Sequence, residues 1–222
     1  MAKPYFRFVP NFNYTSRQKG SNSTDYTQVK NLFKRGKIRE DIFGNISFFT
    51  KYSIIGDERP DNIAYKFYDD SSLDWIILLA NNIINVQSEW PLSQQNFENF
   101  LYEKYSDIET INAVHHYESK EVTTSSGSVI FKKGITIPNN YTISFYDSDL
   151  ETEVTTTNIA VPVTNLEYET KIQEDKRNIF ILKPRYLNII FNDLDDFMPY
   201  EKGSTQYVSR TLKNGYKTKI YE

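Results

Sequence analysis

The two histidines are the first residues to test for catalysis, because imidazole titrates near neutral pH and can act as a base or a metal ligand. They are His115 and His116, which are adjacent in the chain. Successive side chains of a β-strand point to opposite faces, so a strand at this position would separate the two rings. We therefore expect that they neither share a metal ion nor relay a proton, with one ring facing the core and the other the solvent.

Carboxylates are common, but they form no recognisable active site. Asp69 and Asp70 follow an apolar segment at an expected turn, where solvation explains them. No Gly-x-Gly loop or Gly-x-Ser-x-Gly nucleophile elbow is present, and no acidic loop has EF-hand spacing. The sequence therefore predicts a protein that is not an enzyme and that uses neither a cofactor nor a metal ion.

Composition narrows the class of partner. The 222 residues carry 26 basic and 29 acidic side chains, and the net charge of −3 provides no positive field to hold nucleic acid or a membrane surface. Cysteine is absent, which excludes disulfides and thiolate metal sites. The sequence shows no signal-peptide core and no transmembrane segment, so we expect the chain to fold in a cytoplasm. The 17 tyrosines and 15 phenylalanines are typical of protein interfaces, and equally of strands.

The stretch 51–93 has the clearest local pattern, and the other segments are interpreted as attachments to it. A short apolar run at 52–55 predicts a strand that ends in a turn at Gly56. Pro60 fits the first position of a helix, because its fixed φ suits a helix start and its missing N–H has no partner there in any case. Apolar residues at one-turn spacing then predict a short amphipathic helix.

A second helix is predicted at 73–80, with Ser71 as its N-cap and Asn82 near its end. This helix is apolar nearly all round, so we expect it to be buried, and it is far shorter than the roughly 20 residues that cross a bilayer. The expected core of the stretch comes from both helices: Ile63, Ala64, Phe67, Trp75, Leu78 and Leu79.

The order of elements in this stretch is strand, Gly-Asp turn, helix, tight turn, helix ending in Asn, and a second extended piece, which resembles the LysM fold. Several short sequences at this spacing further resemble the baseplate wedge protein 53 family of T-even-like contractile-tailed phages. They are Gly56, Arg59-Pro60, Ile63-Ala64, Tyr68, Leu73-Asp74-Trp75, Glu89-Trp90-Pro91-Leu92-Ser93, and the segments 48–54 and 175–194. The likeness covers most of the chain and is weakest at 1–25 and 147–160.

The resemblance implies a structural virion protein of the tail baseplate, present in multiple copies in a hetero-oligomeric assembly. It implies that the LysM-like unit clamps neighbouring wedge proteins together and prepares the site for the lysozyme-like wedge component and the sheath. An alternative is that the unit binds N-acetylglucosamine polymers such as peptidoglycan or chitin oligomers, as LysM domains at large do. The large flanking elements and the lack of an attached hydrolase favour the first function.

The N-terminal part is expected to contain an arm, a linker and a helix. Residues 5–14 are rich in aromatic side chains and would dock on the body or on a neighbouring chain, whereas 16–25 form a polar linker. Apolar residues at helical spacing predict a helix over 26–36. The basic residues nearby are interpreted as a solvated or salt-bridging face: Lys30, Lys34, Arg35, Lys37 and Arg39.

Further along, Ser93 is expected to cap a helix, and alternating apolar residues predict an antiparallel meander over 111–146, followed by a polar loop at 147–157. The last predicted elements are helices at 166–177 and 185–198, with a strand at 178–184 between them. Three acids lie near the end of the final helix, namely Asp193, Asp195 and Asp196, where the helix dipole disfavours negative charge. We therefore expect a basic partner for them, either Lys202 or a residue of another chain.

The sequence thus predicts an α+β protein: a LysM-like βααβ unit with an N-terminal arm, a small antiparallel β meander and a C-terminal helical segment. The expected divisions are 1–50, 51–110, 111–163 and 164–222. Contacts with partner proteins are expected at aromatic and apolar positions: Phe6, Phe8, Trp90, Tyr186, Leu187, Ile190 and Phe191.

Overall fold

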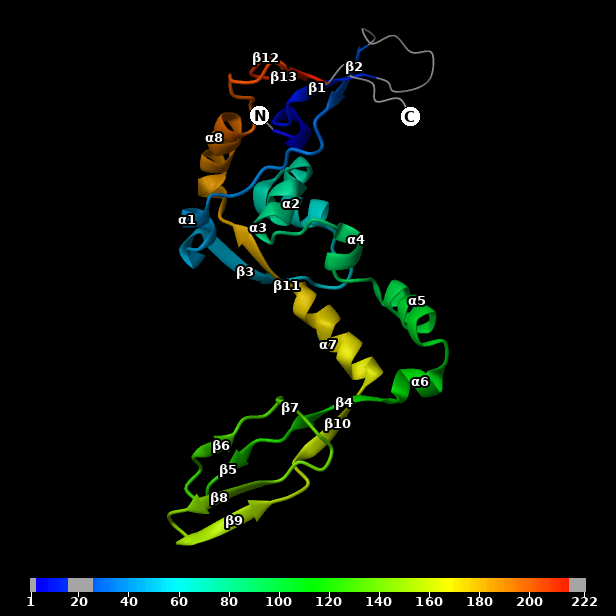
Figure 1. The fold of residues 1–222 in the computed structure, drawn as a ribbon, viewed down its shortest axis with the longest axis vertical. Coiled ribbons are helices and arrows are strands. Elements are labelled where there is room, and N and C mark those ends of the chain that lie inside the picture. Colours follow the sequence, from blue (N-terminus) through cyan, green and yellow to red (C-terminus); the bar gives the residue numbers. More distant parts are fainter. Residues whose placement is uncertain (1–2, 16–25, 216–222) are drawn as a thin grey trace. The chain divides into compact units, whose positions relative to one another are not determined.

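The computed structural model describes residues 3–15 and 26–215 of the chain (Figure 1). The chain is an α+β protein that divides into two compact units. Unit 1 consists of Met1–Trp90 and Asn178–Glu222, and unit 2 is Pro91–Arg177. These boundaries differ from the four expected segments, because the helix at 165–177 belongs to unit 2, whereas the strand and helix that follow it belong to unit 1.

A two-stranded antiparallel sheet and two helices form the centre of unit 1. Strand β3 (Phe49–Ser53) pairs with β11 (Asn178–Leu182), and the helices are α2 (Pro60–Tyr68) and α3 (Asp74–Ala80). The predicted positions of α2, α3 and β11 are confirmed. The second strand of the βααβ order was expected within 51–93, and this prediction is wrong.

The segment after α3 turns into the short helix α4 (Val86–Glu89) instead of a strand. Asn85 caps α4 by accepting from the N–H of Gln87, and the carboxylate of Glu89 accepts from the N–H groups of Ile84 and Asn85. These polar groups satisfy the main chain locally, so no strand partner is required. β11 supplies the second strand because its residues Ile179 and Ile181 are buried against the helices.

The start of the second helix also differs from the prediction. Asp70, not Ser71, is the cap: its Oδ1 accepts from the N–H of Ser72 at 2.9 Å and from the Ser72 hydroxyl at 2.7 Å. A 3₁₀ turn, η3 (Ser71–Leu73), then leads into α3. A carboxylate at this position is favourable because the N-terminus of a helix is electropositive.

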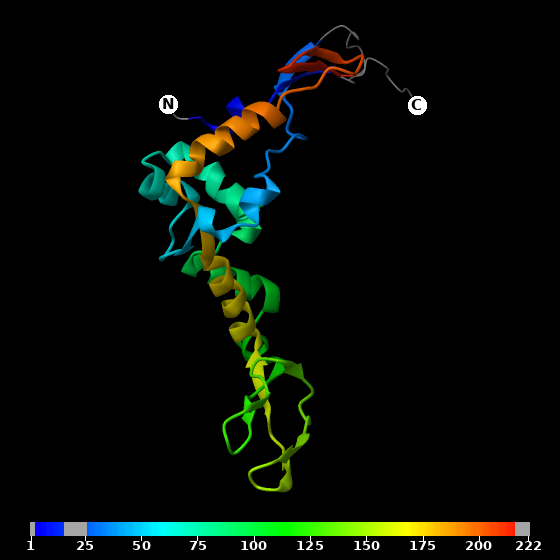
Figure 2. The same cartoon turned by 90° about the vertical axis from the view of Figure 1, so that its left-hand side faces the viewer.

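The N-terminal arm docks on the body of unit 1. Its first turn, η1 (Tyr5–Arg7), precedes Phe8 and Val9, which are buried in the larger apolar cluster of the unit. Figure 2 shows helix α8 running along this segment, and the rings of Phe8 and Phe191 stack with centroids 6.1 Å apart.

The helix predicted over 26–36 is wrong, because Tyr26–Lys30 forms strand β2, which pairs antiparallel with β1 (Asn11–Thr15). The paired residues Tyr26, Thr27 and Val29 have high strand propensity, and pairing with β1 outweighs the local helical spacing. The sheet has the order β12-β13-β1-β2, where β12 is Tyr207–Ser209 and β13 is Leu212–Asn214. The predicted linker at 16–25 lies outside the described residues.

Helix α8 (Leu187–Phe197) confirms the predicted final helix, and its acidic end has partners within the chain. Asp195 bonds to Lys3 Nζ at 2.9 Å, and Asp193 lies 3.3 Å from Nη1 of Arg39. The described partners of Asp195 and Asp193 are therefore Lys3 and Arg39 of the same chain, and not the expected Lys202. The remaining elements of unit 1 are α1 (Glu40–Phe43), η2 (Ile46–Phe48) and η4 (Pro184–Tyr186).

Unit 2 combines three helices with small antiparallel sheets of order β10-β4-β7, β5-β6 and β8-β9. Ser93 caps α5 as predicted, accepting from the N–H of Asn96 at 3.3 Å. The expected polar loop at 147–157 instead contains β9, which pairs with β8 along its full length. The bounds are α5 Gln94–Tyr105, α6 Ile108–Asn112, β4 Val114–Ser119, β5 Val122–Thr123, β6 Val129–Phe131, β7 Thr136–Ile137, β8 Ile143–Asp147, β9 Thr152–Thr156, β10 Ala160–Thr164 and α7 Asn165–Arg177.

The histidines of β4 do not separate as expected. His115 Nδ1 and His116 Nδ1 lie 2.9 Å apart, and the His115 ring stacks on Tyr168 with centroids 4.0 Å apart. The register between β10 and β4 shifts here, from Val163↔His116 to Thr164↔Val114, so His115 lies at an irregularity where strict alternation is lost. Both rings contact Tyr168 of α7. Across the described ranges, no three metal-binding side chains come together.

Candidate interaction surface

The predicted core residues are placed inside or beside the apolar clusters of unit 1. Ile63 and Ala64 of α2 have no exposed surface, and Trp75 and Leu79 of α3 are also buried. Phe67 and Leu78 are half-buried and pack against the cluster formed by α2, α3 and β11. The burial of α3 accounts for its apolar composition without a membrane or a partner protein.

Three of the expected interface residues are core residues instead. Phe8 and Ile190 are buried in the larger cluster of unit 1, and Trp90 is buried in the other, where its indole N–H donates to the carbonyl of Glu58 at 3.1 Å. Their side chains are enclosed by the chain itself, which corrects their assignment to a contact surface. The half-buried members of the set pack against the larger cluster: Tyr186, Leu187 and Phe191.

Among the expected interface residues, Phe6 is the one whose side chain is well exposed. Three further exposed apolar residues were not predicted to form a contact surface. Phe33 is fully exposed, and Leu32 and Ile84 are each exposed over about 70% of their area. We call these four the Phe33 surface: Phe6, Leu32, Phe33 and Ile84. The apolar spacing of 29–33 predicted a helix, and no exposed surface was expected at these residues.

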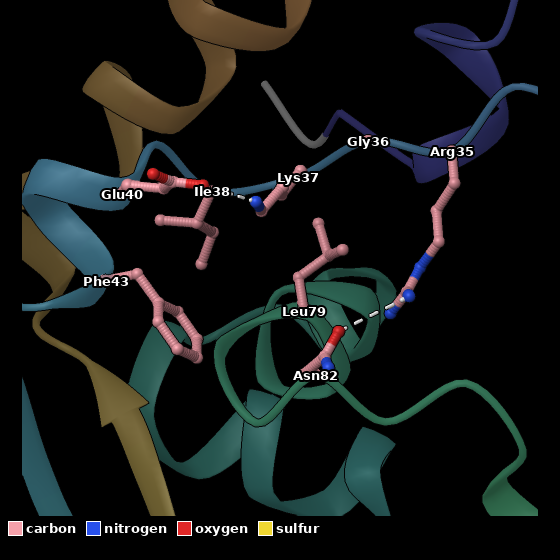
Figure 3. A pocket seen from close by; sticks show the side chains of 8 residues that line it. All are labelled: Arg35, Gly36, Lys37, Ile38, Glu40, Phe43, Leu79 and Asn82. Carbon is pink, nitrogen blue, oxygen red and sulfur yellow. Dashed lines mark hydrogen bonds and ion pairs between the residues drawn. The ribbon is translucent and has the colours of Figure 1, made fainter.

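Residues 35–40 pass over α3 (Figure 3). The guanidinium of Arg35 donates to Asn82 Oδ1 at 3.4 Å and to the carbonyl of Ile83 at 3.2 Å, which ties the passing segment to the end of the helix. Figure 3 shows the Leu79 side chain rising from α3 toward this segment, with Ile38 and Phe43 to one side.

Two pockets share Leu79 and Arg35 as lining residues. The first, of about 520 Å³, is also lined by Ile38 and Phe43. The second, of about 310 Å³, is lined by three residues of the Phe33 surface, Phe6, Leu32 and Ile84, and by Tyr5, Val9, Lys34, Trp75, Leu78 and Ile83. Apolar walls with a few polar groups at the rim are typical of sites that receive the side chains of a partner.

The charged side chains that line the two pockets are mostly basic, and Lys34 and Lys37 already have bonding partners within this chain. Lys34 Nζ donates to the carbonyl of Pro199 at 2.7 Å, and burial lowers the pKa of this lysine. Lys37 bonds to Glu40 at 2.9 Å, and this hydrogen bond lowers the pKa of the glutamate. The arrangement offers apolar contact and positive charge.

Comparison with known proteins identifies the family. A search of curated proteins gives no match. The model of the family described as Base plate wedge protein 53 matches residues 5–197, which include most of both units. Proteins of this family are structural components of the phage tail baseplate. Among the described residues, no helix is long and apolar enough to cross a membrane. The chain belongs to the base plate wedge protein 53 family.

Proposed function

We propose that this chain clamps neighbouring wedge proteins together during baseplate assembly, with the Phe33 surface as a principal contact of unit 1. The observation that supports the proposal is the full exposure of Phe33, which follows Leu32 in the chain, while Leu32 lines one pocket together with Phe6 and Ile84. Grouped apolar side chains exposed to water are a characteristic of protein-binding surfaces, and aromatic residues are over-represented among those that dominate binding energy.

Two separate compact units suit a protein that joins others. The chain passes from unit 1 to unit 2 at Trp90–Pro91 and back at Arg177–Asn178, so two covalent connections link them. Unit 2 has exposed apolar residues of its own, among them Tyr146 and Leu150. If each unit binds a different neighbour, the first contact raises the effective concentration for the second, and the joint is stronger than either contact alone.

The partners that we propose are other baseplate wedge proteins, including the lysozyme-like wedge component, in an assembly that contains several copies of this chain. The basic rim of the Leu79 pockets favours partner surfaces that combine apolar side chains with carboxylates. We further propose that the chain is made in the host cytoplasm and becomes part of the virion. No nucleic acid or membrane is required for this function.

A reconstitution from purified wedge proteins tests the clamp. The double variant Leu32→Ser/Phe33→Ser alters two exposed side chains, so the fold should persist while incorporation into the wedge falls at least tenfold. Tyr65→Ser, at an exposed aromatic residue of α2 outside the Phe33 surface, is the matched control and should incorporate normally. Normal incorporation of the double variant would remove the Phe33 surface from the contact, and a wild-type chain that binds no wedge protein would refute the clamp itself.

A further inference from the structure

The central sheet of unit 1 has one edge that is closed by side chains. On the outer side of β11, Asn81 Nδ2 donates to the carbonyl of Phe180 at 2.9 Å, while its Oδ1 accepts from the Phe180 N–H at 2.7 Å. Further along the same edge, the Tyr68 hydroxyl donates to the carbonyl of Leu182 at 2.9 Å. These side chains occupy the main-chain groups that another strand would use.

The register shows which groups of β3 point away from β11. The Lys183 N–H donates to the Phe48 carbonyl at 2.9 Å, and this bond lies in the same antiparallel register as the pair Phe49↔Leu182. Hydrogen-bonded and non-hydrogen-bonded pairs alternate along an antiparallel ladder. Thr50 and Tyr52 therefore direct their main-chain groups toward β11.

By the same alternation, the main-chain groups of Phe49, Lys51 and Ser53 point outward. The assignment is consistent with the other strand, because the alternation also turns Phe180 and Leu182 outward, where their bonds to side chains are found. On β3, the Phe49 N–H is satisfied by the carbonyl of Ile46.

The outer edge of β3 is open within the described part of the chain. No described strand pairs with this edge, and the residues Lys51 and Ser53 are exposed. The groups available for pairing are the Phe49 carbonyl and both main-chain groups of Lys51 and Ser53. A row of unpaired donors and acceptors of this kind is a template for one more strand.

We propose that an extended segment of another baseplate protein adds to the outer edge of β3 as a third strand, with an acidic side chain placed next to Lys51. Lys51 is the one charged residue of β3, so a carboxylate opposite it is favourable. Two copies of this chain pairing through the whole strand would place Lys51 opposite Lys51, which is unfavourable. This strand addition uses main-chain groups and does not depend on the Phe33 surface.

Hydrogen exchange on the full chain tests the proposal directly. The probe is the wedge assembled from the other wedge proteins of the same phage, without this chain. In the isolated protein, the amides of Lys51 and Ser53 should exchange rapidly, whereas those of Thr50 and Tyr52 should be protected. On addition of the wedge, exchange at Lys51 and Ser53 should slow by roughly tenfold or more, as expected for amides that gain a hydrogen-bonded partner.

A pair of variants at one residue provides the second measurement. Lys51→Pro removes an outward N–H together with the charged side chain, and proline is tolerated on edge strands where its nitrogen faces solvent. Lys51→Ala retains the N–H and removes the charge. Wedge binding should weaken by roughly tenfold for the proline variant, in line with the loss of a main-chain hydrogen bond, and by less for the alanine variant.

The outcomes separate this proposal from the clamp. If the chain binds the wedge while exchange at Lys51 and Ser53 is unchanged, the strand addition is refuted and the clamp stands. Protection of both amides in the isolated protein would also refute it: if the protection depends on concentration, a second copy occupies the edge, and if not, a segment of the same chain does. If Lys51→Pro fails to fold, the exchange measurement on the unmodified chain decides.

Discussion

The side-chain amide of Asn81 joins the end of α3 to Phe180, a residue 99 positions later in the chain. The same Nδ2 that bonds to the Phe180 carbonyl also donates to the carbonyl of Ile77 at 2.8 Å. One side chain therefore satisfies the last turn of a helix and the outer edge of a strand that lies far away in the sequence.

Asn81→Ala should destabilise unit 1, because it leaves the N–H and carbonyl of Phe180 without their partner. The expected loss in the free energy of unfolding is about 1–3 kcal/mol, measured by urea denaturation. Asn62→Ala, at an exposed position of α2, is the control and should change stability by less than about 0.5 kcal/mol. Equal midpoints for the two variants would show that the bonds of Asn81 contribute little.

Trp75→Ala should cost about 3–5 kcal/mol, because the indole is buried among the rings of Tyr5, Phe8 and Phe191 and its removal leaves a cavity. Trp75→Phe should cost clearly less, since it keeps an aromatic ring and removes an indole N–H that is buried without a hydrogen-bond partner among the described residues. Thermal and chemical unfolding of both variants measures the difference. A midpoint for the alanine variant equal to that of the wild type would contradict the described packing.

The stability of unit 1 should fall at high pH, in part because of Tyr68. Burial raises the pKa of this hydroxyl above its ordinary value near 10, so the folded state retains a proton that the unfolded state loses. The contribution is complete below pH of about 10 and declines as the pH rises above it. Denaturation between about pH 8 and 11 should therefore show a shallower decline for Tyr68→Phe, and identical slopes would refute the assignment.

Glu169 should be a stability determinant of unit 2. It is almost completely buried, and its Oε1 accepts from Lys104 Nζ at 2.5 Å and from the Tyr105 hydroxyl at 2.9 Å, which links α7 to α5. Glu169→Ala should lower the free energy of unfolding by about 1–3 kcal/mol, because the hydroxyl and ammonium groups lose their acceptor. Glu103→Ala, on the exposed side of α5, should be close to neutral.

The elements that were predictable from the sequence are those fixed by local chemistry. Pro60 marks the start of α2, Ser93 caps α5, and the apolar spacing of 187–197 specifies α8. In each case the relevant interactions lie within a few residues, so a single sequence contains the information.

The predictions from the sequence were wrong where contacts with residues distant in the chain determine the structure. Residues 26–30 have helical spacing but become a strand because β1 pairs with them. The second strand of the central sheet was sought near α3, although the sheet takes it from beyond unit 2. Ile190 was assigned to a contact surface because periodicity identifies an apolar face without showing what covers it.

The insertion of unit 2 between α4 and β11 also sets an order of events during synthesis. Phe49 and Leu182 are paired in the sheet but about 130 positions apart, so the ribosome must complete the whole of unit 2 before β3 can meet its partner. Domains generally fold as units while the chain emerges, so unit 2 is free to fold while the apolar faces of α2 and α3 still lack β11. The apolar faces of α2 and α3 therefore remain open to misassociation until residues 178–182 have left the ribosome.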